Sequence, residues 1–399
     1  MRILRVTTIC VVLSAGAALA QPCDVIANGG AHYPSLTSAL AALPDRDGNH
    51  LQVSGVCQEK ASVLNHVNLR IDGTPGARLE PPPATTEPQP QTLNIRTSDT
   101  VTVRNLTIRG KADVCGAVSI WQSREVTFSD VTVETGGSEG AVWVIESFSV
   151  FLQNAVIQNS GNGIRVDGPA HVVLQGAWNP NQSGTAYLQN NLTGARMSRG
   201  AVLSLRGDTL VRNNNVGVSG NGGGLSVCCV DDIAHPRIEN NAVYGAFMRG
   251  GDVQIQGPLI VQGNGIWGLV LIGTQARISD ALIRTNGPPQ RTGGGIIAIG
   301  GLLEVTRGEI SANQGPGILV SDGATGRLSS AQITGNAGEG IDVQGLSVVS
   351  IFGGSVRDNR GFDLRCAPNS FGRGNADGVE KLHCGGFDQS PDPTPGGKE

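Results

Sequence analysis

The chain has few of the residues that build ordinary helices and globular cores. Only 4% of its 399 residues are aromatic, and it contains 58 Gly and 20 Pro. So many helix-breaking residues argue against a stack of helical domains, and so few aromatics leave little for a conventional sandwich core. Hydrophobic residues still make up 39% of the chain, which argues against disorder. A repeat array can be this long and remain one unit.

Positive charge and long apolar runs are scarce as well. The formal net charge is −4 and lysine occurs four times, which disfavours nucleic acid as a partner. The apolar run at residues 7–13 is too short for a transmembrane span. Because two arginines precede it and an Ala-Leu-Ala sequence ends at residue 20, we expect residues 1–20 to be a secretory signal peptide. The mature chain is then expected to be secreted or periplasmic, with no membrane span.

An asparagine motif recurs with a spacing of about 24 residues, at Asn214, Asn241, Asn264, Asn286, Asn313, Asn336 and Asn359. A short strand follows each asparagine, further short strands lie between the motifs, and no helical periodicity separates them. Three short strands per repeat are typical of a parallel β-helix, whereas leucine-rich repeats need a helical half and propellers a longer period. Asparagine tolerates the left-handed bend between strands, and stacked asparagines can hydrogen-bond from coil to coil.

This pattern resembles the right-handed parallel β-helix superfamily, which includes pectate lyases and polygalacturonases, over roughly residues 50–365. The expected fold is an all-β solenoid of about eleven or twelve coils. Residues 35–43 have helical apolar spacing after a Ser cap and should form a short N-terminal capping helix. We therefore predict an N-terminal cap and first coils at 21–92, the β-helix proper at 93–365, and a C-terminal cap loop and tail at 366–399.

Cysteines near both ends suggest disulfides, because an oxidising compartment allows them to form. The expected pairs are Cys23–Cys57 at the N-terminal cap and Cys366–Cys384 at the other end. Cys115 is expected to be a buried thiol, and Cys228-Cys229 either a vicinal disulfide or two thiols. No C-x-x-C or paired His spacing is present, so no metal site is predicted.

In related β-helix enzymes the substrate cleft follows the outer face of the strand after the asparagine bend, so residues pointing outward there are of interest. With Ile164, Leu203 and Leu225 pointing inward, strand alternation places Ser204 and Ser226 on this outward face. The same alternation predicts a polar zone there with Arg165, Asp167, Arg206 and Arg249. It also predicts an apolar patch with Phe247, Val270, Ile297 and Leu319. Such a patch marks a protein partner or a dimer interface, or lies under the chain's own loops or tail.

The polar zone is the candidate for chemistry. Asp208 and Asp231-Asp232 are one coil apart and should share a corner, with His235 close by. Paired carboxylates can act as general acid and base in glycoside hydrolysis, or bind Ca²⁺ in a lyase. An arginine can hold a uronate carboxylate, and Trp178, in an insertion, could stack on a sugar.

These features predict a protein that binds or processes an acidic polysaccharide. The polygalacturonase and pectate lyase motifs are missing, so it remains open whether the chain is an enzyme, and surface turns with Arg–Asp pairs would also explain the polar zone. The alternative is a non-catalytic adhesion or structural module that uses the apolar patch.

Overall fold

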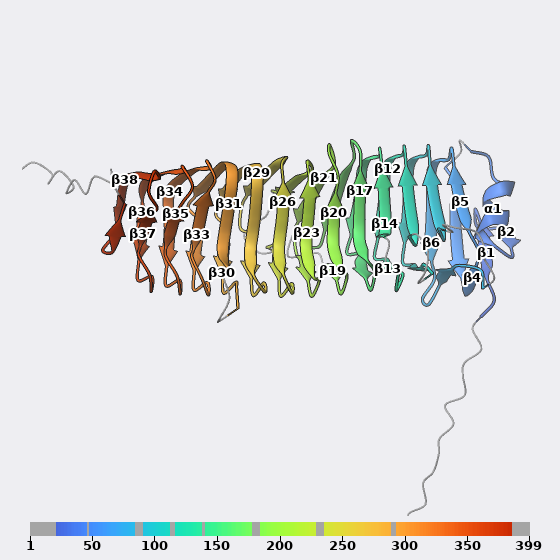
Figure 1. Cartoon of the computed structure of the whole chain (residues 1–399). Coiled ribbons are helices and arrows are strands. Elements are labelled where there is room, and N and C mark those ends of the chain that lie inside the picture. The colour runs from blue at the N-terminus through green and yellow to red at the C-terminus, as the bar shows by residue number, and fades with distance from the viewer. Residues whose placement is uncertain are drawn as a thin grey trace, which may run out of the picture.

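The computed structural model describes residues 21–45, 48–83, 91–111, 116–137, 140–177, 184–228, 235–288 and 293–384. The strands wind into one straight rod, with the single helix of this part of the chain, α1 (Leu36–Ala42), at one end (Figure 1). Apart from two antiparallel pairings at the N-terminal end, each strand pairs in parallel with its equivalent in the next coil. The rod is therefore a parallel β-helix, as predicted, and it has about 13 turns.

Each coil supplies a strand to each of three sheets. The first sheet contains β5 (Ala61–Leu64), β8 (Leu93–Arg96), β11 (Val118–Trp121), β14 (Gly140–Ile145), β17 (Asn162–Asp167), β20 (Thr193–Met197), β23 (Val216–Asn221), β26 (Tyr244–Arg249), β33 (Ile318–Ser321), β35 (Ile341–Val343), β37 (Leu364–Cys366) and β39 (Leu382–His383). The second contains β3 (His50–Ser54), β6 (Val67–Gly73), β9 (Asp99–Arg104), β12 (Arg124–Ser129), β15 (Phe148–Gln153), β18 (His171–Gln175), β21 (Val202–Arg206), β24 (Gly224–Val227), β27 (Asp252–Gln256) and β38 (Phe371–Asp377).

The third sheet is built from shorter strands: β4 (Val56–Gln58), β7 (Arg78–Glu80), β10 (Thr107–Arg109), β13 (Thr132–Glu134), β16 (Val156–Gln158), β19 (Ala186–Gln189), β22 (Thr209–Arg212), β25 (Arg237–Glu239), β28 (Ile260–Gln262), β30 (Leu282–Arg284) and β32 (Glu309–Ser311). Four long strands turn a corner and serve two sheets. They are β29 (Trp267–Ser279) and β31 (Gly294–Thr306), between the first and second sheets, and β34 (Thr325–Thr334) and β36 (Val348–Arg357), between the second and third.

The core is a stack of inward-facing apolar side chains. On the first sheet Ile296, Ile318, Ile341 and Leu364 lie in register on successive coils, and all are fully buried. Because side chains alternate across a strand, the residues between them point outward. Each coil buries its inner face only by stacking on its neighbours.

The predicted asparagine ladder is confirmed. The side chains lie inside the rod where the third sheet turns into the first, and each is at most 1% exposed. Asn286 Nδ2, for example, donates to Asn313 Oδ1 (3.0 Å) and to the backbone oxygen of Val261 (3.1 Å). The series begins one coil earlier than the motif, at Asn191, and ends on the carboxylate of Asp363.

The N-terminal end is closed by α1 and by two antiparallel strands. β1 (Asp24–Ala27) pairs with β3 on one side and with β2 (Ala31–Tyr33) on the other. Ser35 caps the helix, as predicted, by accepting a hydrogen bond from Ser38 N (3.0 Å). None of the helices in the described ranges is long and apolar enough to cross a bilayer.

Both predicted disulfides are present, Cys23–Cys57 at the N-terminal end and Cys366–Cys384 at the other. The predictions for Cys115 and Cys229 fall outside the described residues, as do the signal peptide and the tail beyond residue 384. The domain boundaries remain predictions.

The sequence assigned two layers to the wrong sheet. Leu203 and Leu225 were expected to follow Ile164 on the first sheet, but Ala195 and Val218 occupy those places. Leu203 and Leu225 lie instead on β21 and β24 of the second sheet. All three sheets repeat with the same period, so spacing alone cannot distinguish a leucine of one sheet from a smaller residue of another.

Candidate binding site

The predicted polar zone is divided between faces of the rod. Arg165 and Asp167 lie on β17, and Arg249 on β26, all on the first sheet. Arg206 ends β21 on the second sheet, paired in register with Gln175. Its predicted place beside Asp167 and Arg249 is therefore wrong, because it was derived from the misassigned layer at Leu203.

Asp208 lies beyond Arg206, at the corner that leads to the third sheet. Its two oxygens accept hydrogen bonds from Thr185 Oγ1 (2.5 Å) and from Arg237 (2.9 Å). His235 is partly buried, and its Nδ1 has no hydrogen-bond partner among the described residues. The other members of the predicted catalytic set, Asp231 and Asp232, lie outside the described residues, and so does Trp178.

On the first sheet, Arg165 and Asp167 form a local cluster with a tryptophan of the preceding coil. Arg165 Nε donates to Asp167 Oδ2 (2.7 Å), and the Trp143 Nε1 donates to the same oxygen (2.7 Å). The Arg165 guanidinium also lies 4.6 Å from the Trp143 ring centroid. The protein itself therefore supplies several partners for these groups.

A polar groove of roughly 420 Å³ lies on the outer face of the second sheet. It crosses four neighbouring strands, β18, β21, β24 and β27, so its long direction follows the rod. Its lining combines three ionisable residues with small and polar ones: His171, Arg206, Asp252, Val202, Ser204, Gly224, Leu225, Ser226 and Gln254. The surface is hollow here because Gly224 has no side chain and because the side chains of Ser204 and Ser226 are short.

The polar groups of this groove are only partly satisfied by one another. His171 Nε2 and Ser204 Oγ are 2.8 Å apart, and Gln254 Nε2 donates to Asp252 Oδ2 (2.5 Å). Asp252 Oδ1 and Arg206 Nε are shielded from solvent and have no hydrogen-bond partner within the described chain. Such atoms are costly to leave unpaired. Because solvent does not reach them, a ligand in the groove would contact the accessible parts of the same two side chains, which are both half-buried.

Burial lowers the pKa of His171, and repulsion from the nearby Arg206 guanidinium adds to the effect. His171 is therefore neutral at neutral pH. At that pH the full charges of the groove are Arg206 and Asp252.

The sequence identified Arg206 but not the rest of the groove. Ser204 and Ser226 were assigned to the wrong sheet, and His171 and Asp252 carried no motif. One feature of the sequence could have pointed to these two residues. His171 and Asp252 are the first residues of β18 and β27, and they point outward in line with Val202 and Gly224.

The predicted apolar patch has the expected register. Phe247, Val270, Ile297 and Leu319 lie directly above one another on four successive strands of the first sheet. Val270 is only 5% exposed, because its neighbours cover it. The role of the patch as an interface remains a prediction.

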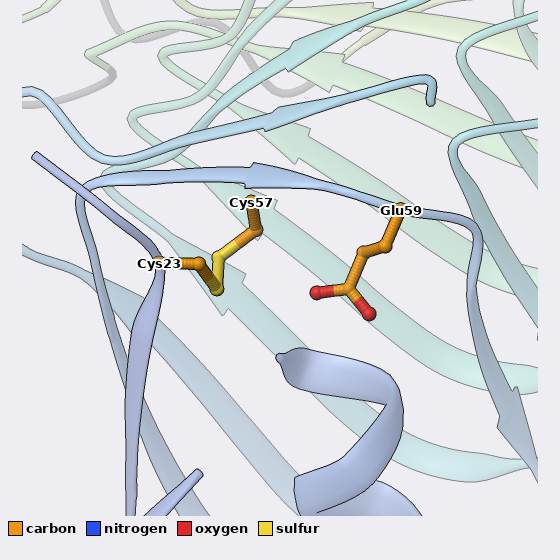
Figure 2. Close-up of side chains that lie close together, drawn as sticks. All are labelled: Cys23, Cys57 and Glu59. Atoms are coloured by element: carbon orange, nitrogen blue, oxygen red, sulfur yellow. A yellow bond between two sulfur atoms is a disulfide. The ribbon is translucent and has the colours of Figure 1, made fainter. Parts of the chain in front are cut away.

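Figure 2 shows Cys23, Cys57 and Glu59, whose potential ligand atoms lie within 4.8 Å of one another. The two sulfurs are bonded to each other, so neither is available as a thiolate ligand. The Glu59 carboxylate accepts hydrogen bonds from Leu36 N (2.6 Å) and Thr37 N (2.8 Å) at the start of α1. These three residues fasten the N-terminal cap to the first coil.

Comparison with known proteins identifies the architecture. Residues 231–373 match a family model described as a right handed beta helix region. No curated protein matches the sequence.

Several solved structures are similar to the chain at low identity. The A-module of the mannuronan C-5 epimerase AlgE4 from Azotobacter vinelandii is 14% identical, with 82% of this chain and 88% of that chain covered and a TM-score of 0.41. An exopolygalacturonase from Thermotoga maritima is 10% identical, with 85% and 88% covered and a TM-score of 0.31. The receptor binding domain of the Siphovirus 9NA tailspike is 11% identical, with 92% and 77% covered and a TM-score of 0.35. The family match and the coil geometry agree that the fold is a right-handed parallel β-helix.

Proposed function

We propose that this protein is secreted and binds an acidic polysaccharide in the groove on its second sheet. The observation that carries the proposal is the incompletely paired Arg206 guanidinium in a polar hollow. A guanidinium matches the planar geometry of a carboxylate and can bind it through two parallel hydrogen bonds. A uronate residue presents such a carboxylate.

The remaining lining suits the hydroxyl groups of a sugar. Asp252, Ser226 and Gln254 all belong to the lining of the groove. A sugar hydroxyl can donate to the carboxylate and accept from a serine or an amide. Arg206 and Asp252 thus give the groove one site for an anion and one for a hydroxyl donor.

The direction of the groove favours a polymer over a small molecule. It is open and runs across four coils, so an extended chain can enter and leave along the rod. Binding alone accounts for these features. Hydrolase or lyase chemistry would need the predicted carboxylates Asp208, Asp231 and Asp232. Of these, Asp208 already accepts hydrogen bonds from Thr185 and Arg237.

The test is calorimetric titration with hexagalacturonate and hexamannuronate. Arg206→Ala should weaken oligouronate binding at least tenfold, since a hydrogen bond to a charged group contributes about 1.5–3 kcal/mol. Arg327→Ala is the matched control: Arg327 lies on the same sheet, on β34 beyond the groove, and is paired with Glu304 (3.1 Å). Equal affinities for wild type and Arg206→Ala, or no oligouronate binding by either, would contradict the proposal.

A second candidate rests on the apolar patch. Four apolar side chains in strict register form a surface on which a protein partner or a second copy could dock. Phe247→Ser would then abolish an association that sedimentation velocity detects in the wild type. A concentration-independent monomer would exclude self-association through this surface.

A further inference from the structure

A separate trough lies on the early coils, where the first sheet turns into the second. It joins a hollow of roughly 610 Å³ to one of roughly 350 Å³, and Thr97 lines both. The corner residues Asn65, Thr97, Gln122 and Glu146, on four successive coils, border it. It shares no lining residue with the groove around Arg206.

The corner residues adopt a backbone conformation that favours glycine. Their φ angles lie between 46° and 59°, in the left-handed region, and all four side chains are exposed. At the same corner of later coils the chain uses glycine, at Gly222, Gly250, Gly273 and Gly300. A non-glycine residue there costs about 1 kcal/mol. Other corners of the rod also carry polar residues in this conformation, for example Asn105, Asp130 and Asn154, so it is the side chains at this corner, and not the strain, that distinguish the first coils.

Hydrogen bonds hold these side chains in fixed orientations along the rod. Thr97 Oγ1 donates to Asn65 Oδ1 (2.6 Å), and Gln122 Nε2 donates to Glu146 Oε2 (3.0 Å). Beneath them the buried Ser98, Ser123 and Ser147 link successive corners through backbone-to-hydroxyl hydrogen bonds of 3.2 Å. The result is a rigid row of amide, hydroxyl and carboxylate groups that repeats once per coil.

Two exposed aromatic rings accompany this row. Phe148 lines the second hollow and is 54% exposed, and Trp121, directly before Gln122, is 39% exposed. Exposure of large apolar rings is unfavourable, and rings beside polar groups are a common way to hold an amphipathic ligand. Pyranose rings have this character, with apolar C–H faces and a rim of hydroxyls.

Charge separates this trough from the groove. Among the described lining residues the basic one is Arg124, which is paired with Asp99 (2.5 Å). The exposed Arg96 guanidinium lies nearby, 4.5 Å from the centroid of the Trp121 ring. The Asp45 and Glu146 carboxylates form no ion pair in the described part of the chain and add negative charge. An acidic polymer would be repelled, whereas hydroxyl groups of a neutral sugar can donate to these carboxylates.

We infer that the trough is a second binding site, which takes a neutral, unbranched polysaccharide lying along the first coils. A surface that repeats with each coil suits a ligand that also repeats. The proposal goes beyond acidic polysaccharide binding at Arg206 and does not depend on it.

The experiment uses the full chain and an immobilised panel of cellohexaose, xylohexaose, mannohexaose and hexagalacturonate. The wild type should bind at least one neutral hexasaccharide, and Phe148→Ala should weaken that binding about tenfold. Phe371→Ala is the matched control, because Phe371 is 57% exposed at the opposite end of the rod.

A double change, Gln122→Gly with Glu146→Gly, tests the polar row without disturbing the fold. It installs the residue that later coils use at this corner, so thermal stability should be kept while neutral glycan binding is lost. Arg206→Ala should leave neutral binding unchanged, so the two sites can fail independently. No binding to any neutral hexasaccharide, or wild-type binding by both variants, would overturn the inference. So would a dimer that Phe148→Ala dissociates, because the ring would then serve a protein contact.

Discussion

At the scale of single residues, the asparagine ladder is where sequence and structure agree best. Asparagine is needed there because its amide satisfies buried groups on neighbouring coils. The left-handed bend that was expected at the asparagine lies one residue earlier, for example at Thr285 and Ala312, so it does not require asparagine at the ladder position. Asn286 accepts from Asn264 and donates to Asn313 and to Val261 O. A hydrophobic residue of similar size would remove these bonds and the one that Asn264 N donates to Asn286 Oδ1 (3.1 Å). Asn264 Nδ2 would keep its bond to Ile238 O, and Asn313 Oδ1 its bond from the backbone N of residue 286.

Replacing Asn286 by alanine should therefore lower the free energy of unfolding by about 3 kcal/mol, since each unsatisfied buried group costs about 1–3 kcal/mol. Guanidinium titration measures the change. Gln332→Ala, exposed on β34, is the control and should change stability by less than about 0.5 kcal/mol. Equal effects at the two positions would mean that the ladder contributes nothing beyond an ordinary surface side chain.

Two histidines should make the fold sensitive to acid. Burial lowers the pKa of His66, against a smaller opposing effect of Asp45, and burial together with Arg206 lowers that of His171. In the unfolded chain both have a pKa of about 6.5. As the pH falls below that value the unfolded state takes up protons that the folded state does not, so stability decreases.

The free energy of unfolding should thus fall between pH 7 and the lower pKa values of the folded protein, and His66→Asn with His171→Asn should flatten this slope. Denaturant titrations at pH 7.5, 6.5 and 5.5 measure it. An unchanged slope in the double variant would assign the acid sensitivity to carboxylates instead.

At the scale of elements, the sequence predicts the short helix α1 but not Glu59, the residue that binds the start of this helix to the first coil. A Ser cap before apolar residues at helical spacing predicts α1, and the structure has it at Leu36–Ala42. Glu59 lies 23 residues beyond Leu36 and reaches the helix start only because the chain folds back under it. The wrong placement of Arg206 has the same cause, because a contact between coils cannot be predicted from one segment. The sequence predicted correctly that Arg206 faces outward, but it assigned the residue to the first sheet instead of the second. Which faces carry hollows depends on side-chain volumes on several coils, and no single segment contains that information.

Glu59→Ala should loosen α1, because the helix start loses acceptors for two backbone N–H groups and a negative charge at its positive end. We expect a loss of about 1–2 kcal/mol and faster amide hydrogen exchange at Leu36 and Thr37. Glu59→Gln keeps one acceptor oxygen and should lose less. Equal exchange in all three proteins would show that Ser35 suffices as the cap.

At the scale of the whole molecule, stability should be distributed along the rod, because each coil contacts only its neighbours. Closing the 18-residue span between Cys366 and Cys384 contributes about 3 kcal/mol in a chain-entropy estimate. Cys366→Ser with Cys384→Ser should therefore raise hydrogen exchange in β37 and β39 and leave β14 and β17 unchanged. Uniformly faster exchange would indicate that the rod unfolds as one cooperative body rather than fraying from its end.

Because the ladder asparagines recur once per coil, the length of the rod can change only by whole coils if the ladder is to be kept. Residues 265–286 run from just after one ladder asparagine to the next, so removing them would join Asn264 directly to Gly287 and leave Asn313 as its new neighbour. Every face would keep its angular position, because a full winding has been excised. Whole coils can thus be removed from or added to the rod without rotating those that remain. Removal of this coil would shorten the apolar patch by Val270 and leave the linings of the groove and of the trough intact, since both consist of residues before 265.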